Sequence, residues 1–300
     1  MIYTVTFNPA IDYVMRLPVL RPGETNRAVT SQIQFGGKGV NVSCVLRELG
    51  VENTALGFVA GFTGNALAEH LSALGVRTDF IRLPEGNTRI NVKLKTSEGS
   101  TKETEINAAG PAIPDACLQS LLAKLDTLTE GDTLVLAGSI PASLPRNTYS
   151  RILSRLAGKG IRFVVDAEGA LLTAVLPYRP FLIKPNRVEL EGIMGRDLPT
   201  DEDLQEAATE LQRQGAMNVL VSLGGDGALL LDEHGTVHRC PAHAIPPVNT
   251  VGAGDSTVAG FLAGADRGYG YALRLGMACG GATAGAEGLA TVESISALMV

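Results

Sequence analysis

The stretch Asn249-Thr-Val-Gly-Ala-Gly-Asp-Ser-Thr-Val-Ala-Gly-Phe261 is the part of this 300-residue chain that decides its fold. Gly252, Ala253 and Gly254 are small enough for their backbone N–H groups to close around a phosphate, and the apolar residues from Val258 onward predict a helix. Unpaired N–H groups and the helix dipole favour an anion at a helix N-terminus. The stretch therefore predicts a phosphate site at the start of a helix.

Asp255 falls in the first turn of this predicted helix, within reach of a hydroxyl group that attacks the same phosphate. Because an alcohol is a poor nucleophile at neutral pH, a carboxylate that accepts its proton is a suitable general base. A glycine-rich turn with Asp255 as a helix cap explains the same residues. Taken alone, the stretch leaves both interpretations open.

A second glycine cluster, Gly36-Gly-Lys-Gly-Val-Asn41, also precedes a helical pattern, which runs through residues 45–50. Two such loops indicate two ends of one substrate. Neither is a Walker loop, because Lys38 and Lys159 are each followed by Gly rather than by Ser or Thr. No Gly-x-Gly-x-x-Gly joins an early strand to a helix, so a dinucleotide-binding fold is also disfavoured.

With these two loops in this order, the chain resembles the ribokinase-like (PfkB) sugar kinases, whose signatures are Gly-Gly-x-Gly-x-Asn and Gly-Ala-Gly-Asp. Within that family the likeness is nearest to the bacterial 1-phosphofructokinases. Four further segments support it: Thr6-Phe-Asn-Pro-Ala-Ile-Asp12, Thr88-Arg-Ile-Asn-Val-Lys-Leu-Lys95, Leu136-Ala-Gly-Ser-Ile-Pro141 and Lys184-Pro-Asn186. The resemblance extends over almost the whole chain.

Composition agrees with an enzyme of this kind. A formal net charge of −6 disfavours a nucleic-acid partner, because such proteins usually have a basic patch. No apolar run approaches the length of a membrane span, and the N-terminus begins directly with a strand pattern rather than a signal peptide. We therefore expect no membrane association and a cytoplasmic location. No two of the four cysteines are spaced as a Cys-x-x-Cys pair, which disfavours a redox motif.

One cluster of possible zinc ligands lies within ten residues: His234, His238, Cys240 and His243. An alternating strand pattern places His238 and Cys240 on one face but gives the other two no defined geometry. These spacings match known zinc patterns poorly, so strand and loop positions without a metal are the favoured interpretation.

Strand and helix patterns alternate along the chain, which is typical of an α/β fold with a mainly parallel sheet and helices on both faces. Apolar runs predict strands over residues 55–60, 133–137, 161–166, 181–184 and 218–223, and helices over 65–74, 118–128 and 201–214.

Residues 12–34 and 87–108 interrupt this rhythm with half-exposed strand patterns. They predict a small, discontinuous β layer outside a core formed by residues 1–11, 35–86 and 109–300. The resemblance implies that this layer is a lid over the sugar and a contact between the subunits of a homodimer. A pair of ordinary edge hairpins is the alternative.

The acceptor side of the predicted site needs polar groups for sugar hydroxyls and cations for a phosphate. Asp12 and Asn41 can orient hydroxyls, and Arg27, Lys38 and Arg89 can hold a phosphate. The resemblance implies sugar contacts from Asp12, Gly37, Lys38, Asn41, Arg89 and Ser139. It also implies that Arg27 reaches the phosphate from the lid, either of its own subunit or of the partner subunit. Taken singly, an exposed Arg or Lys is more often a solvated charge.

The nucleotide side lies in the second half of the chain. A glycine-rich turn after a strand includes Ser222, Gly224 and Gly227, and Lys184 and Asn186 end another strand, where ligands of open α/β sheets bind. The resemblance implicates Glu189, in an Asn-x-x-Glu pattern, in binding Mg²⁺. A helix of small residues around Cys279 predicts either an adenine contact or tight helix packing.

The resemblance implies ATP-dependent phosphorylation of fructose 1-phosphate to fructose 1,6-bisphosphate, with Asp255 as base. Tagatose 6-phosphate and fructose 6-phosphate are alternative acceptors, and a nucleoside or an unphosphorylated sugar is a further one. A sugar-phosphate or nucleotide-binding regulator without catalysis is the alternative of another class, and the intact Asp255 argues against it. Many relatives have Asp where this chain has Asn249, and that Asp helps to form a monovalent-cation site, so potassium dependence stays open.

Overall fold

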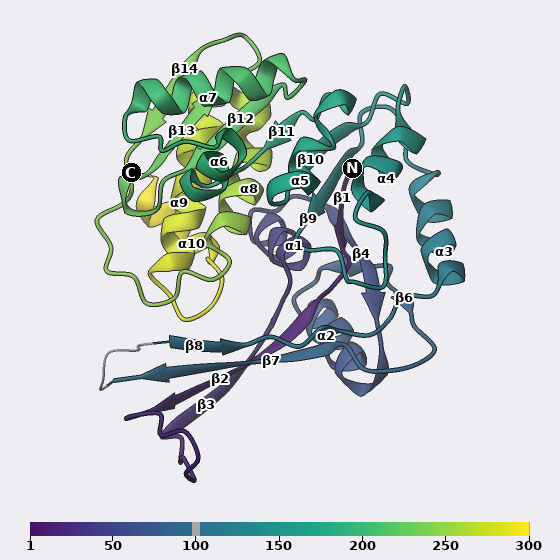
Figure 1. The fold of residues 1–300 in the computed structure, drawn as a ribbon, viewed down its shortest axis with the longest axis vertical. Helices are drawn as coiled ribbons and strands as arrows, with labels where there is room; N and C mark the ends of the chain where they lie inside the picture. Colours follow the sequence, from purple (N-terminus) through teal and green to yellow (C-terminus); the bar gives the residue numbers. More distant parts are fainter. Residues whose placement is uncertain (98–102, 300) are drawn as a thin grey trace.

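A large central sheet and a smaller sheet that projects from it make up the architecture (Figure 1). The computed structural model of the chain describes residues 1–97 and 103–299. In this part the large sheet has ten strands and the small sheet has four. Helices cover both faces of the large sheet, whereas the small sheet extends away from the body of the molecule.

The strands of the large sheet follow the order β14-β13-β12-β11-β10-β9-β1-β4-β5, with β6 also paired to β4. All of these pairs are parallel except β12 with β13 and β13 with β14. The strands are β1 (Ile2–Thr6), β4 (Asn53–Val59), β5 (Arg77–Thr78), β6 (Ile81–Arg82), β9 (Thr133–Ala137), β10 (Arg162–Asp166), β11 (Leu182–Ile183), β12 (Asn218–Ser222), β13 (Ala228–Leu231) and β14 (Val237–Cys240).

Successive side chains of a strand enter opposite faces of the sheet, and both faces are apolar here. In β9, Leu134 and Leu136 join one hydrophobic cluster, and Val135 and Ala137 join another. The first face is covered by α3 (Asp115–Leu125), α4 (Thr148–Leu156), α5 (Gly169–Thr173), α6 (Arg187–Met194) and α7 (Asp201–Arg213). The second is covered by α1 (Lys38–Glu48), α2 (Gly61–Ala73), α8 (Ala253–Gly264), α9 (Tyr269–Ala284) and α10 (Val292–Leu298).

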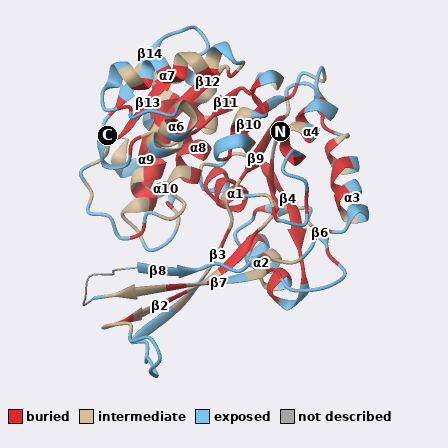
Figure 2. Cartoon of the chain, in the orientation of Figure 1, coloured by how far each residue is buried: buried red, intermediate tan, exposed pale blue. Residues whose placement is uncertain are grey.

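The fold confirms the predicted parallel sheet with helices on both faces. The strand predicted over 133–137 has those bounds, and the others shift by one or two residues. The predicted strand 181–184 shortens to Leu182–Ile183, because Pro180 and Pro185 lie close to its two ends and lack the N–H group that a ladder needs. Figure 2 shows the buried residues concentrated in the large sheet and on the inner sides of its helices.

The small sheet contains β2 (Ala10–Leu17), β3 (Thr30–Gly36), β7 (Arg89–Thr96) and β8 (Glu103–Ile106), in the order β3-β2-β7-β8. Its two central strands, β2 and β7, are parallel, and each pairs with its outer neighbour in the antiparallel sense. A separate small sheet was predicted from residues 12–34 and 87–108. Whether those residues move as a lid domain remains a prediction.

None of the helices in residues 1–97 and 103–299 is both long and apolar enough to cross a membrane.

Candidate active site

A cavity of about 960 Å³ lies between the small sheet and the carboxyl ends of the parallel strands β1, β9, β10 and β12. Ligands of open α/β sheets bind at this edge. Most residues that the sequence predicted for a site line it: Asp12, Gly37, Lys38, Asn41, Arg89, Ser139, Lys184, Asn186, Glu189, Ser222, Gly252, Gly254 and Asp255.

The N-terminus of α8 forms one wall of this cavity. Gly252 precedes the helix in the left-handed region, with φ of 82°, a conformation that glycine adopts without strain. No side chain caps the helix. The N–H of Ala253 donates to the carbonyl oxygen of Thr250, so the N–H groups of Gly254 and Asp255 in this first turn are the ones left for an anion.

Asp255 is the third residue of α8 and is only 6% exposed. Its Oδ2 accepts a hydrogen bond of 2.7 Å from Nδ2 of Asn41 on α1, so the two glycine-rich segments of the sequence meet at this carboxylate. The cap interpretation of Asp255 is wrong, because its side chain bonds to another helix rather than to its own N-terminus.

Burial raises the pKa of Asp255 to about 6, and the negative charge of Asp166 adds to this effect. The hydrogen bond from Asn41 and the positive charges of Lys38 and Lys184 oppose it. A carboxylate with this pKa is still ionised at neutral pH but is more basic than an ordinary aspartate. That balance suits a general base.

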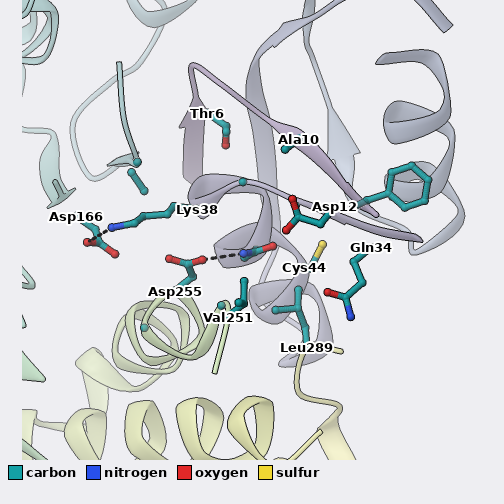
Figure 3. Close-up of a pocket in the computed structure, with 18 of the residues that line it drawn as sticks. Thr6, Ala10, Asp12, Gln34, Lys38, Cys44, Asp166, Val251, Asp255 and Leu289 are labelled. Atoms are coloured by element: carbon teal, nitrogen blue, oxygen red, sulfur yellow. Dashed lines mark hydrogen bonds and ion pairs between the residues drawn. The ribbon is translucent and has the colours of Figure 1, made fainter. Parts of the chain in front are cut away.

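Asp166, at the end of β10, is the site residue that the sequence analysis missed. It is 1% exposed and holds two ammonium groups. Lys38 Nζ lies 3.1 Å from Oδ1 (Figure 3), and Lys184 Nζ lies 3.4 Å from Oδ2. Although burial alone would raise the pKa of Asp166, the two lysines hold it below its usual value. A carboxylate that ends a buried apolar strand at the ligand-binding edge was the available signal.

The two lysines lie close to the start of α8. The pKa of Lys38 is raised because the charges of Asp166 and Asp255 outweigh the effect of burial. A Cβ on Gly254 would lie 3.1 Å from Nζ of Lys184, so the ammonium group packs against the backbone of the helix N-terminus. A side chain at position 254 would have to displace it. Backbone N–H groups and an ammonium thus converge on one space suited to a phosphate.

The small sheet forms the opposite wall. Asp12 on β2 faces the cavity, and its Oδ1 accepts a hydrogen bond of 2.8 Å from Nδ2 of Asn91 on β7. Arg89 donates from Nε to the carbonyl oxygen of Asn8 and from Nη1 to that of Ala108, each at 3.2 Å. Burial lowers the pKa of the Arg89 guanidinium, which nevertheless stays protonated in proteins.

Asn186 and Glu189 form the capping box of α6, since the Asn186 side chain accepts from the backbone of Glu189 and Glu189 Oε2 accepts from the backbone of Asn186. Both residues also line the cavity, beside Ser222. Gly224 and Gly227 follow Ser222 in the turn between β12 and β13 and lie outside the lining of the cavity.

Arg27 and Cys279 also lie outside the lining of the cavity. Arg27 is exposed in the loop between β2 and β3 and does not line it. Cys279 is fully buried in α9, where its Sγ would lie 2.7 Å from a Cβ on Gly260 of α8. The small residues around Cys279 therefore serve close packing of α8 against α9, and its thiol presents no surface to an adenine ring.

The histidines of the possible zinc cluster point to different partners. His238 Nε2 lies 2.7 Å from Asp232 Oδ2, whereas the ring of His243 packs against Gly281 of α9.

Asn249 is engaged at both ends of its amide, since Nδ2 donates to the carbonyl of Glu287 and Oδ1 accepts from the backbone of Val251.

Three comparisons with known proteins agree with this geometry. The model of the pfkB family of carbohydrate kinases matches residues 5–295. The 1-phosphofructokinase of Bacillus subtilis is 42% identical over 301 residues, covering 100% of this chain and 97% of the relative. The D-tagatose-1-phosphate kinase of Bacillus licheniformis is 37% identical, covering 98% and 96%. The solved structure of phosphofructokinase-2 from Escherichia coli with substrates and products gives a TM-score of 0.92 at 28% identity, covering 99% and 98%.

A ribokinase-like α/β fold with an uncapped helix N-terminus beside a buried carboxylate is the arrangement expected of a phosphotransferase. The chain belongs to the pfkB family of carbohydrate kinases, as its two glycine-rich segments predicted.

Proposed function

We propose that this protein transfers the γ-phosphoryl group of ATP to the 6-hydroxyl of fructose 1-phosphate, giving fructose 1,6-bisphosphate and ADP. Asp255 accepts the hydroxyl proton as the new oxygen–phosphorus bond forms and the bond to ADP breaks, and ADP leaves with the bonding electron pair. The observation that supports this best is the buried Asp255, with its raised pKa, at an open helix N-terminus.

The surrounding groups support distinct parts of this step. The N–H groups of Gly252 and Gly254 would stabilise charge on the transferring group, whereas that of Ala253 donates to the carbonyl oxygen of Thr250. Lys38 and Lys184, held by Asp166, would neutralise the phosphates of ATP. Ser222 and Asn186 lie where the rest of the nucleotide would extend, with Gly224 and Gly227 in the adjoining turn. Asp12, Asn41, Gly37 and Ser139 would contact the sugar, and Arg89 its phosphate.

The residues present fit Mg²⁺ bound mainly through ATP. Glu189 faces the cavity, and its Oε2 is engaged in the capping box while Oε1 is available to a metal or its water. Among residues 1–97 and 103–299 there is no cluster of three or more acidic, His or Cys side chains that would enclose a metal. Mg²⁺ keeps several waters and typically uses one or two carboxylates with substrate phosphates, so it would help to neutralise charge on ATP.

A second candidate acceptor is D-tagatose 1-phosphate. The relative from Bacillus licheniformis is named for that substrate and is 37% identical over almost the whole chain. Tagatose and fructose differ in the configuration at one hydroxyl, which the same cavity could accommodate. Both candidates place a phosphate at C1 and the attacking hydroxyl at C6.

The experiment is a measurement of ADP release with MgATP and a panel of acceptors: fructose 1-phosphate, fructose 6-phosphate, tagatose 1-phosphate, tagatose 6-phosphate and fructose. We expect the highest kcat/KM with fructose 1-phosphate. A higher kcat/KM with another sugar phosphate would replace the substrate but keep the reaction. No ADP release with any acceptor would reject the kinase function.

We also infer a homodimer that forms through the outer face of the small sheet. The register places Ile33, Tyr13, Val92 and Ile106 in one row across all four strands. Ile33 and Ile106 are 56% and 59% exposed. Tyr13 and Val92 between them are half-buried. Apolar side chains exposed at both edges of one sheet face are typical of an interaction surface. In a dimer formed there, Arg27 could approach the acceptor phosphate in the partner's cavity.

Sedimentation velocity tests this inference. The wild type should sediment as a dimer, and Ile33→Lys with Ile106→Lys should shift it to a monomer. The matched control is Val188→Lys on α6, because Val188 is 75% exposed but lies outside the small sheet. A monomeric wild type, or a dimer that survives both substitutions, would contradict the inference.

A further inference from the structure

Lys93 on β7 is a buried cation of the cavity wall to which the proposed reaction assigns no role. Its neighbours two and four residues back, Asn91 and Arg89, share its face of the strand, and all three line the cavity. Lys93 is 5% exposed. Because a buried ammonium group loses its hydration, it needs close anionic partners.

Those partners are carboxylates of the small sheet itself. Lys93 Nζ lies 3.0 Å from Oδ2 of Asp12 and 3.7 Å from Oε1 of Glu105 on β8. The Glu105 side chain is 41% exposed, whereas that of Asp12 is 13% exposed. Asp12 is therefore the closer and more buried partner, and Lys93 is its main counter-ion.

Asp12 is held at both carboxylate oxygens. Asn91 Nδ2 donates to Oδ1, and Lys93 occupies Oδ2. The Asn91 amide is itself oriented, since its Oδ1 accepts a hydrogen bond of 3.2 Å from the backbone N–H of Ala108. A carboxylate with one contact on each oxygen is fixed in one orientation and still has lone pairs for sugar hydroxyls.

Arg89 differs from Lys93 although both lie on the same face of the same strand. Arg89 is bonded to two backbone carbonyl oxygens, and in the described part of the chain no carboxylate lies within ion-pairing distance of it. Its positive charge is therefore available to a phosphate. The charge of Lys93 is already balanced by two carboxylates, which makes it a poor phosphate ligand.

We propose that Lys93 is the positioning residue of the acceptor site: it acts through Asp12, by fixing and balancing the carboxylate that binds the sugar hydroxyls, and does not bind the acceptor phosphate. This proposal rests on the proposed kinase function. It assigns two different tasks to the two cations of β7, with Arg89 binding the substrate and Lys93 orienting Asp12.

A double-mutant cycle tests this assignment. The variants are Lys93→Met, Asp12→Asn and the two combined, and the readouts are kcat, KM for fructose 1-phosphate and KM for ATP. We expect each single variant to lose roughly ten- to a hundredfold in kcat/KM for the acceptor, the range for losing a hydrogen bond to a charged group. Most of the loss should be in the acceptor KM, with the ATP KM within about twofold of the wild type, because neither residue lies at the start of α8.

The combined variant distinguishes the two roles of Lys93. If Lys93 acts through Asp12, removing it from the Asp12→Asn protein costs nothing further, and the combined loss equals that of Asp12→Asn alone. If Lys93 binds the phosphate directly, the two losses multiply, and that result overturns the proposal. Unchanged acceptor kinetics in Lys93→Met or in Asp12→Asn would overturn it as well.

The combined variant and Lys93→Arg keep the test informative if Lys93→Met folds poorly. The combined variant replaces the close pair by neutral side chains and leaves only the half-exposed Glu105 carboxylate, so it should fold. Lys93→Arg keeps the charge and should retain kcat/KM for the acceptor within about tenfold. Lys124→Met is the matched control, because Lys124 pairs with Asp79 on the surface far from the cavity.

The wild type separates this proposal from the proposed function. If the wild type does not phosphorylate fructose 1-phosphate or another sugar phosphate of the panel, the kinase function fails. If the wild type is active and the losses multiply, only the role of Lys93 fails.

Discussion

Two ion clusters on opposite walls of the cavity combine carboxylates and ammonium groups in opposite proportions. On the wall of the large sheet, one carboxylate, Asp166, holds the two ammonium groups of Lys38 and Lys184, a net charge of +1. On the wall of the small sheet, one ammonium, Lys93, lies between the carboxylates of Asp12 and Glu105, a net charge of −1. The first arrangement suits a polyphosphate and the second suits hydroxyl groups.

This difference indicates how one cavity can bind two substrates in a defined direction. In the proposed reaction, the ammonium groups of Lys38 and Lys184 would attract the nucleotide phosphates, and acceptors on the opposite wall would bind the sugar. Arg89 is the exception on the sugar side, and in the proposed reaction its guanidinium would bind the acceptor phosphate. The following substitutions test whether the two walls act separately.

The largest effect should come from the base at the junction of the two walls. Asp255→Asn should lower kcat by at least about a hundredfold, the low end for loss of a general base, while ATP binding measured by calorimetry stays within about threefold. Asp126→Asn, in a surface ion pair with Arg155, is the control. Near-normal turnover in Asp255→Asn would assign the base to another group.

Asp166→Asn should mainly affect the stability of the large-sheet wall. It leaves two ammonium groups without their carboxylate, so we expect the free energy of unfolding at pH 7 to fall by about 2 to 3 kcal/mol, measured in urea. The estimate lies below the range of about 3 to 5 kcal/mol for breaking a fully buried pair, because the Lys38 side chain is 33% exposed. An unchanged free energy of unfolding would show that the pair contributes nothing.

The difference in the free energy of unfolding between the wild type and Asp166→Asn should depend on pH with a definite sign. The pKa of Asp166 is lower in the folded protein than in the unfolded chain. Its contribution is therefore fully present above the unfolded value of about 4 and is lost as the pH falls through the folded value. The wild type and Asp166→Asn should accordingly differ most above about pH 5 and converge in acid. A difference that grows in acid would contradict the ion-pair account.

A smaller effect, on one substrate only, is expected for Arg89→Ala. It should raise the KM for fructose 1-phosphate by about 30-fold, as expected for losing one charge-assisted contact, and leave the KM for ATP within about twofold. Arg155→Ala on the surface is the control. Equal increases in both KM values would reject the separation of the two walls.

Residues adjacent in the sequence were the predictable part of the site. The Gly252 to Asp255 segment alone left a ligand loop and a capped turn both open, and the Gly37 to Asn41 segment, a second glycine cluster before a helix, favoured the ligand loop. The alternation of apolar strands and helices likewise predicted the sheet and its two covered faces. In each of these cases the physical signal is local.

Contacts between distant strands were not predictable in the same way. Asp166 is 128 residues from Lys38, and only the parallel arrangement of β1, β9, β10 and β11 brings them together. The pairing of Lys93 with Asp12 likewise needs the register of β2 on β7, which no sequence pattern specifies. Cys279 shows a different limit, because a local pattern of small residues fits a ligand contact and close helix packing equally well. In the structure, Gly260 of α8 packs against the Cys279 side chain.

The pH dependence of kcat tests most directly whether Asp255 is the base. At saturating MgATP and acceptor, kcat should be constant above neutrality and fall tenfold per pH unit below about 6, the pKa to which burial raises this carboxyl. Asp126→Asn should give the same profile as the wild type. A kcat that stays constant down to about pH 4.5 would mean that no group with a raised pKa accepts the proton, and it would contradict the mechanism.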